Sequence, residues 1–233
     1  LNAILLKATD KSIIFIDEAH ELKKEFQTSL YLALDNRKII VSGGNSPTTI
    51  PLADFTLLLA STDEHCLLPP LTSRMSLLLR FTYYSEDELQ IILKQRSIAL
   101  GWNVDDFVFK IISERSKGTP RLALRLLQAC RRVCRSLGET EITVEHLMKS
   151  CDLEQIDNRG LGITEQKYLQ IVGDGMTRLN VIASKIGLPS QTVSKVIEPY
   201  LIRSGLIVKD DQGKRQLTEI GHQHVSYLCS ITD

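Results

Sequence analysis

The stretch KSIIFIDEAHELKK, residues 11–24, determines the fold class that we expect for this chain. Its apolar run, Ile13 to Ile16, ends in two adjacent acids, Asp17 and Glu18. A short run that is apolar throughout predicts a strand of a parallel sheet, buried on both faces. Acids at the end of such a strand indicate either a solvated turn or a phosphate-transfer site. In such a site one carboxylate helps to hold Mg²⁺ and a second polarises the attacking water.

The bulk composition excludes several classes of protein. The chain has 233 residues, 43% of them hydrophobic, which predicts one large domain or two to three small ones. Its 28 basic and 28 acidic residues give a net charge of zero, so any surface that attracts nucleic acid must be local. We find no apolar run of transmembrane length, no signal peptide and no cysteine spacing typical of zinc. These features indicate a cytoplasmic protein with reduced thiols, and the start at Leu1 suggests a fragment whose beginning is missing.

The pattern of strands and helices over residues 1–82 predicts a partial α/β core. Strands are expected at 13–16, 55–60 and 77–81, and a helix at 21–34. The runs 38–41 and 48–52 flank the turn residues SGGNSP and predict a hairpin. Apolar strands separated by helices predict a parallel sheet with both faces covered.

The remaining residues predict two further domains. Residues 83–155 are expected to be all-helical, with Ser85 and Thr143 capping two helices and the stretch GTPR, 118–121, opening another. Residues 156–233 show three helical patterns, 164–172, 178–186 and 190–203. Two short strands, 206–208 and 215–218, then flank the turn KDDQGK. This order is typical of a winged helix-turn-helix domain that binds DNA.

Several polar residues have both a functional and an ordinary interpretation. Thr62 ends the strand at 55–60, where a hydroxyl can contact a phosphate or simply cap the strand. Arg74 in LTSRM is either an exposed arginine or a finger that reaches a neighbouring subunit's nucleotide. Arg121 begins a helix, where the dipole disfavours a cation, so its position suggests a bound anion. His20 is better explained as a hydrogen-bonding structural residue than as a metal ligand, and the other motifs of the DEAH helicase superfamily are missing.

The order of these motifs resembles the AAA+ ATPases, and in detail the RuvB family of Holliday junction branch migration motors. FIDEAHEL is similar to the family's FIDEIHRL, DFTLLLAST to RFTLIGATT and LTSRM to LRDRF. SKGTPRLALRLL resembles SRGTPRIANRLL, and EPYLIRSGLI resembles EPYLIQQGFL. The resemblance covers nearly the whole chain and implies a partial P-loop ATPase core, a helical lid and a winged helix.

The resemblance also implies a role for each matching site residue. Asp17 would hold Mg²⁺ through water, and Glu18 would activate the water that attacks ATP. Thr62 would be sensor 1, Arg74 the finger acting in trans, and Arg121 sensor 2, which contacts the nucleotide.

Partners follow from the same resemblance. We expect a homo-hexamer on double-stranded DNA at a Holliday junction, together with a RuvA-like junction-binding protein. The hairpin would dock that protein, although its tip differs from the family's, through Ile40, Gly43, Gly44 and Ile50. The wing would contact DNA phosphates through Lys209, Lys214 and Arg215.

One departure from the family is large, because the chain contains no G-x-x-x-x-G-K-[ST] phosphate-binding loop. In the family this loop lies upstream of the position of Leu1, so we expect truncation and no ATP turnover by this chain alone. The expected function of the complete protein is ATP-dependent branch migration in recombination and DNA repair. The alternatives are a non-catalytic DNA-binding or scaffold protein that retains lid and winged helix, and a clamp-loader or origin-binding AAA+ relative.

Overall fold

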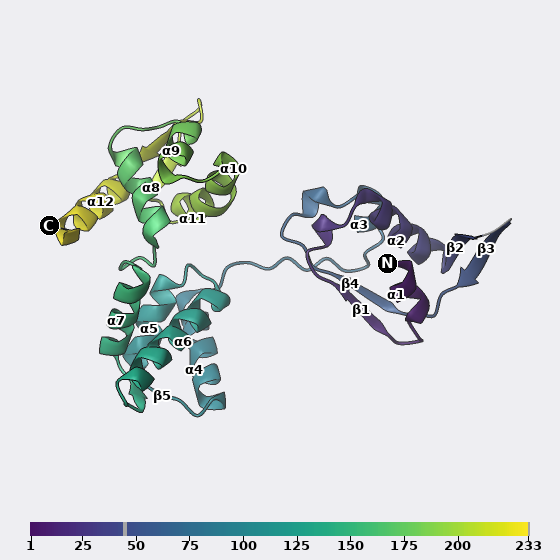
Figure 1. Cartoon of the computed structure of the whole chain (residues 1–233), viewed down its shortest axis with the longest axis horizontal. Coiled ribbons are helices and arrows are strands. Elements are labelled where there is room, and N and C mark those ends of the chain that lie inside the picture. The colour runs from purple at the N-terminus through teal and green to yellow at the C-terminus, as the bar shows by residue number, and fades with distance from the viewer. Residues whose placement is uncertain (44–45, 233) are drawn as a thin grey trace. The chain divides into compact units, whose positions relative to one another are not determined.

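The computed structural model describes the backbone of residues 1–43 and 46–232, and the side chains of 1–39 and 48–230. The chain divides into two compact units, Leu1–Phe81 and Thr82–Asp233, which are considered separately (Figure 1). Among the described residues, no helix is both long enough and apolar enough to cross a membrane.

The first unit contains a parallel strand pair and a separate hairpin. Its elements are α1 (Asn2–Lys7), β1 (Ile13–Ile16), η1 (Ala19–Glu21), α2 (Lys24–Asn36), β2 (Lys38–Gly43), β3 (Ser46–Pro51), β4 (Thr56–Leu59), η2 (Glu64–Cys66) and α3 (Pro69–Thr72). Strand β1 pairs in parallel with β4, with Ile13 opposite Thr56, and β2 pairs antiparallel with β3. The parallel pairing and the hairpin expected from the sequence are therefore confirmed.

The β1–β4 sheet is covered on one face within the described residues. Ile14 and Ile16 pack against a core that includes Leu30 of α2. Ile13 and Phe15 point the other way and are 68% and 59% exposed. The expectation that both faces are covered is wrong for the part of the chain that the structure describes.

The predicted strand at 77–81 is also absent from the described structure, which has no regular element there. Leu77, Leu79 and Phe81 are exposed. A strand forms only where a neighbouring strand satisfies its backbone groups. Apolar composition alone does not supply such a neighbour.

The second unit contains two hydrophobic clusters. Its elements are α4 (Glu86–Ala99), β5 (Asn103–Val104), α5 (Asp106–Arg115), α6 (Pro120–Ser136), β6 (Glu141–Ile142), α7 (Val144–Glu154), α8 (Ile163–Gly173), α9 (Leu179–Ile186), α10 (Ser190–Thr192), η3 (Val193–Ile197), α11 (Glu198–Arg203), β7 (Ile207–Lys209), β8 (Arg215–Leu217) and α12 (Glu219–Thr232). One cluster includes Leu93, Ile112 and Leu127 of the first helices. The other includes Leu169, Ile182 and Leu201, which belong to the winged helix.

The helices of the second unit begin where the sequence predicts. Ser85 forms a capping box with Glu88 at the start of α4, and Thr143 forms one with His146 at the start of α7. Pro120 occupies the first turn of α6, where its missing N–H costs nothing.

The helix expected over 190–203 is present as one continuous helical run, in which the π-helical turn η3 lies between α10 and α11. Pro199 explains the π-helical turn, because in a regular α-helix its ring would clash with the carbonyl of Lys195, four residues earlier, and it has no N–H to donate. Helix α12, which packs against α8, was not predicted from the sequence.

Candidate functional site

The carboxyl ends of β1 and β4 lie at one edge of the parallel pair. The pairing register places Ile16 opposite Leu59. Asp17 and Glu18 therefore leave the sheet beside Thr62. The Thr62 hydroxyl Oγ1 donates a hydrogen bond to Oε2 of Glu18 at 3.3 Å. The structure thus brings together two residues that lie 44 positions apart and were each predicted to be functional.

Glu18 adopts a left-handed backbone conformation, with φ of 48°. Such a conformation is uncommon outside glycine and indicates a local constraint. The N–H of Glu18 donates to Oδ1 of Asp17 at 3.0 Å, and the side chains of both acids are exposed. The constraint turns the two adjacent carboxylates sharply at the strand end.

His20 lies beside this pair and contacts polar groups from two segments. Its Nδ1 is 3.4 Å from Oε2 of Glu18 and 3.2 Å from Oγ of Ser61. No group of three or more His, Cys, Asp or Glu side chains with metal-binding geometry occurs in the described part of the chain. These contacts support the hydrogen-bonding interpretation of His20.

Arg74 is held by its own unit. Its Nε donates to Oδ1 of Asp35 at 2.6 Å, its Nη2 donates to Oδ2, and its Nη1 donates to the Pro70 carbonyl. The guanidinium carbon also lies 5.0 Å from the centre of the Tyr31 ring. Hydrogen bonding from Arg74 lowers the pKa of the Asp35 carboxyl. Asp35 was not predicted as a site residue, because no local sequence pattern links it to a residue 39 positions away.

Arg121 lies in the first turn of α6, in the second unit. Its side chain is exposed, and within the described residues it has no ion-pair partner. A cation at this end of a helix is electrostatically disfavoured unless an anion is bound. Arg121 therefore remains available for an anionic ligand.

The wing differs from the sequence prediction. Arg215 was expected to project from the β7–β8 turn, and this placement is wrong. Its Nε and Nη2 donate to the two carboxylate oxygens of Glu198 at 2.8 and 3.2 Å, and its side chain is only 11% exposed. Lys209 also contacts Glu198, with Nζ 2.6 Å from Oε2. Lys214 is half-buried and has no ion pair among the described residues.

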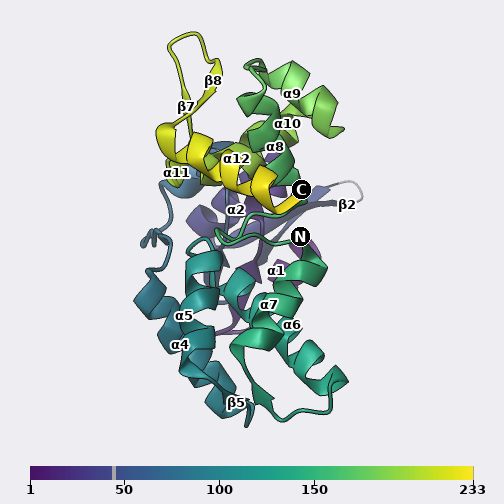
Figure 2. The same ribbon diagram turned by 90° about the vertical axis from the view of Figure 1, so that its left-hand side faces the viewer.

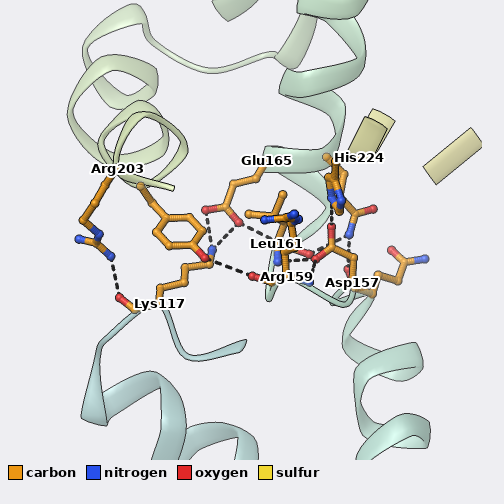
Figure 3. A network of polar contacts seen from close by, with 11 residues as sticks. Lys117, Asp157, Arg159, Leu161, Glu165, Arg203 and His224 are labelled. Carbon is orange, nitrogen blue, oxygen red and sulfur yellow. Dashed lines mark hydrogen bonds and ion pairs between the residues drawn. The ribbon is translucent and has the colours of Figure 1, made fainter. Parts of the chain in front are cut away.

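The loop between α5 and α6 connects the lid to the winged helix (Figure 3). Lys117 Nζ lies 2.6 and 2.5 Å from the two carboxylate oxygens of Glu165 on α8. Arg203 on α11 donates to the Lys117 carbonyl at 2.7 Å. Lys117 directly precedes the GTPR stretch, so the same loop contacts the winged helix and leads into Arg121.

A second contact joins the lid to the winged helix near the end of the lid, and we call these contacts together the junction between lid and winged helix. Nε2 of His224 on α12 lies 2.8 Å from Oδ2 of Asp157, and both side chains are buried (Figure 3). The other oxygen of Asp157 accepts hydrogen bonds from the backbone N–H groups of Arg159 and Leu161. No sequence pattern predicted these contacts between the lid and the winged helix, because they join residues that are distant in the chain.

Three family models match successive parts of the chain. The model of the Holliday junction DNA helicase RuvB P-loop domain matches residues 1–81. The RuvB AAA lid domain matches 84–157, and the RuvB C-terminal winged helix domain matches 158–226.

Known proteins named as Holliday junction branch migration complex subunit RuvB are similar over most of the chain. The relative from Thermotoga maritima is 31% identical, and the match covers 97% of this chain and 70% of the relative. The relative from Kosmotoga olearia is 34% identical over 97% of this chain and 68% of its own length. A solved structure of the T. maritima RuvB Holliday junction branch migration motor superposes with a TM-score of 0.81 at 30% identity. That superposition covers 97% of this chain and 73% of the solved chain.

Proposed function

The chain belongs to the family of RuvB Holliday junction branch migration motors, and from this premise we propose that it acts as a subunit of an ATP-dependent DNA motor. The observation that carries the proposal is the contact between Glu18 and Thr62 at the ends of β1 and β4. A hydroxyl that holds one oxygen of an exposed carboxylate leaves the other oxygen to accept a proton from water. This arrangement suits hydrolysis of the terminal phosphoanhydride bond of ATP.

We propose that Asp17 takes part in holding Mg²⁺. Proteins usually bind this ion with one or two carboxylates, while waters and substrate phosphates complete the coordination. A single exposed aspartate at a strand end fits that pattern, although the described residues contain no larger acidic cluster. Bound Mg²⁺ would neutralise charge on the phosphates of ATP.

Arg74 and Arg121 are the proposed cationic contacts to nucleotide. Asp35 and Pro70 engage one hydrogen on each nitrogen of Arg74. The second hydrogens on Nη1 and Nη2 stay available for a phosphate of a neighbouring subunit. Asp35 thus orients the finger without using all of its donors, which supports an assembly in which subunits complete each other's sites. We propose the homo-hexamer for that assembly.

The division of the chain is part of the same proposal. Residues 1–82 would form the ATPase core, 83–155 the lid and 156–233 the DNA-binding winged helix. In the wing, Lys214 remains the proposed phosphate contact. Arg215 is not proposed as a phosphate contact, because its guanidinium is paired inside the domain.

The hairpin β2–β3 is the proposed docking element for a RuvA-like partner. Ile50 is half-buried and lies opposite Ile39 in the pairing. Of the other predicted docking residues, Gly44 lies outside the described residues, and the side chain of Ile40 does as well. The backbone at Gly43 is described as the end of β2.

The proposal is tested with a chimera in which a phosphate-binding segment of the T. maritima relative precedes these 233 residues. We expect the chimera to convert synthetic four-way junctions to duplex products with ATP and Mg²⁺. Glu18→Gln should stop conversion, because the amide cannot accept the proton of water. Thr62→Val should slow it, while Thr62→Ser, which keeps the hydroxyl, should retain most of the rate. Full activity in the Glu18→Gln chimera would show that these residues do not perform hydrolysis.

A further inference from the structure

The winged helix contains a carboxylate that is fully enclosed. Glu198 has no exposed surface, and it begins α11 directly before Pro199. Its Oε1 accepts hydrogen bonds from Nε of Arg215 at 2.8 Å and from the Tyr168 hydroxyl at 3.0 Å. Its Oε2 lies 2.6 Å from Nζ of Lys209 and 3.2 Å from Nη2 of Arg215. We refer to Glu198, Tyr168, Lys209 and Arg215 as the Glu198 cluster.

The Glu198 cluster joins four elements of the domain at one point. Tyr168 comes from α8 and Glu198 from α11, while Lys209 and Arg215 come from β7 and β8. Burial raises the pKa of the Glu198 carboxyl, but the hydrogen bonds from Arg215, Lys209 and Tyr168 outweigh it, so the pKa lies below its usual value. The carboxylate therefore stays charged, and its bonds to the two cations are of the strong, charge-assisted kind.

The pairing of the wing explains how one acid holds two cations. Lys209 is the register partner of Arg215 at the end of the β7–β8 ladder. Directly opposite residues of an antiparallel pair place their side chains on the same face. Both side chains therefore lie on the face that meets α11, while the turn between them extends beyond the helices of the domain (Figure 2).

The cluster changes the charge that the wing presents to solvent. Lys209, Lys214 and Arg215 outnumber Asp210 and Asp211 by one positive charge in the sequence. Pairing with Glu198 cancels that excess and leaves Lys214 as the cation of the wing without an ion pair among the described residues. Asp210 meanwhile accepts hydrogen bonds from the N–H groups of Gln212 and Lys214 and fixes the turn.

We propose that Glu198 is a positioning residue that pairs with the exposed Lys209 and the buried Arg215, and so limits the wing's contact with DNA phosphates to Lys214. This inference rests on the proposed function, in which the winged helix binds duplex DNA. Each phosphate contact adds about 0.9 to the slope of log affinity against log salt concentration on duplex DNA. A wing with one such contact binds weakly and without regard to sequence, which suits a subunit that must release the duplex as it moves.

The first test compares two single-charge changes in the 233-residue chain. Lys214→Ala should flatten the salt slope by about 0.9, because it removes the phosphate contact. Lys209→Ala removes the same charge from the same hairpin, yet it should leave the slope unchanged, because Lys209 faces Glu198. Both are measured by salt titration on two unrelated short duplexes, with circular dichroism as a check of folding. Equal flattening by the two variants would overturn the inference.

The second test releases both cations at once. Glu198→Gln keeps the shape of the side chain and removes its charge. It should steepen the salt slope by up to about 1.8, that is two further contacts, and tighten binding to both duplexes alike. If Glu198 only stabilised the fold, its loss would weaken duplex binding or leave the salt slope unchanged. A folded Glu198→Gln variant with an unaltered salt slope therefore contradicts the inference. Glu165→Gln, which breaks an ion pair away from the wing, should leave the slope unchanged and is the matched control.

These outcomes separate the inference from the proposed function. Absence of duplex binding by the wild-type chain and by every variant would refute DNA binding by the winged helix, and the inference with it. Duplex binding whose salt slope is flattened equally by Lys209→Ala and by Lys214→Ala would refute this inference and leave the proposed function in place.

Discussion

The ion pair between Lys117 and Glu165 is expected to stabilise the second unit, and Glu165→Gln tests it. The two side chains are only 15% and 16% exposed, and both carboxylate oxygens contact Nζ. Removing one partner of a buried pair costs about 3 to 5 kcal/mol because the other charge is left unpaired. The remaining solvent exposure of the two side chains reduces this free-energy cost. The Tyr200 ring reduces it further by attracting the Lys117 ammonium, because its centre lies 4.9 Å from Nζ of Lys117. We therefore expect a loss of about 2 kcal/mol.

The expected loss is measurable by urea denaturation of the chain. The single tryptophan, Trp102, packs against the lid core and reports on unfolding of the lid, while far-ultraviolet circular dichroism reports on all helices. For a unit of this size, 2 kcal/mol corresponds to a fall in Tm of roughly 4 to 8 °C. In the wild type we expect the lid signal and the helix signal to change together, because the junction couples lid and winged helix.

The matched control is Lys94→Met. It breaks the pair between Lys94 and Asp106, whose side chains are 46% and 78% exposed. Exposed pairs contribute little, so the loss should stay below about 1 kcal/mol. Equal losses in Lys94→Met and Glu165→Gln, or no loss in Glu165→Gln, would refute the reasoning that burial gives the Lys117 contact its strength.

Three further predictions concern hydrolysis and pH. The 233-residue chain, which contains no G-x-x-x-x-G-K-[ST], should show no ATP turnover with Mg²⁺ and DNA; turnover that disappears in Glu18→Gln would contradict this. In the chimera, Arg74→Ala should reduce hydrolysis by about 10³ or more and leave nucleotide binding mostly intact, and mixing with Asp17→Asn subunits should restore part of the rate; mixtures as inactive as their components would exclude action in trans. Because the folded-state pKa of Glu198 is lowered, its contribution to stability is present above the unfolded pKa of about 4.3 and is lost as pH falls through the folded value. Acid denaturation followed by circular dichroism should therefore show a smaller loss of stability below pH 4 in Glu198→Gln than in the wild type, and parallel curves would contradict the assignment.

The sequence predicted those parts of the fold that depend on local patterns. The run that ends at Ile16 became β1, and the runs on either side of Gly44 pair as the two strands of a hairpin. Ser85 and Thr143 cap helices because their side chains act on backbone groups within one turn. The register of the parallel pair, which the sequence did not predict, brings Glu18 to Thr62.

The features that the sequence did not predict depend on partners that are distant in the chain. Arg215 lies two residues after Gly213 of the turn, which locally favours an exposed cation, but Glu198 lies 17 residues earlier and pairs with it. The apolar run at 77–81 has the composition of a strand, yet the described structure offers it no strand to pair with. Charge and composition identify which residues can interact, whereas the choice among partners is made by packing.

The loop at Lys117 shows how one short segment serves both packing and the proposed site. Lys117 has φ of 54°, and Gly118 follows with φ of 73°, so the chain turns sharply there. A side chain at position 118 would approach Cβ of Tyr83 to 2.9 Å, so the turn has room only for glycine. The turn directs the Lys117 side chain towards Glu165, while Arg121 lies in the first turn of the next helix. Under the proposed function, nucleotide binding that shifts the backbone at Arg121 would also shift Lys117 and its contacts with Glu165 and Arg203 in the winged helix.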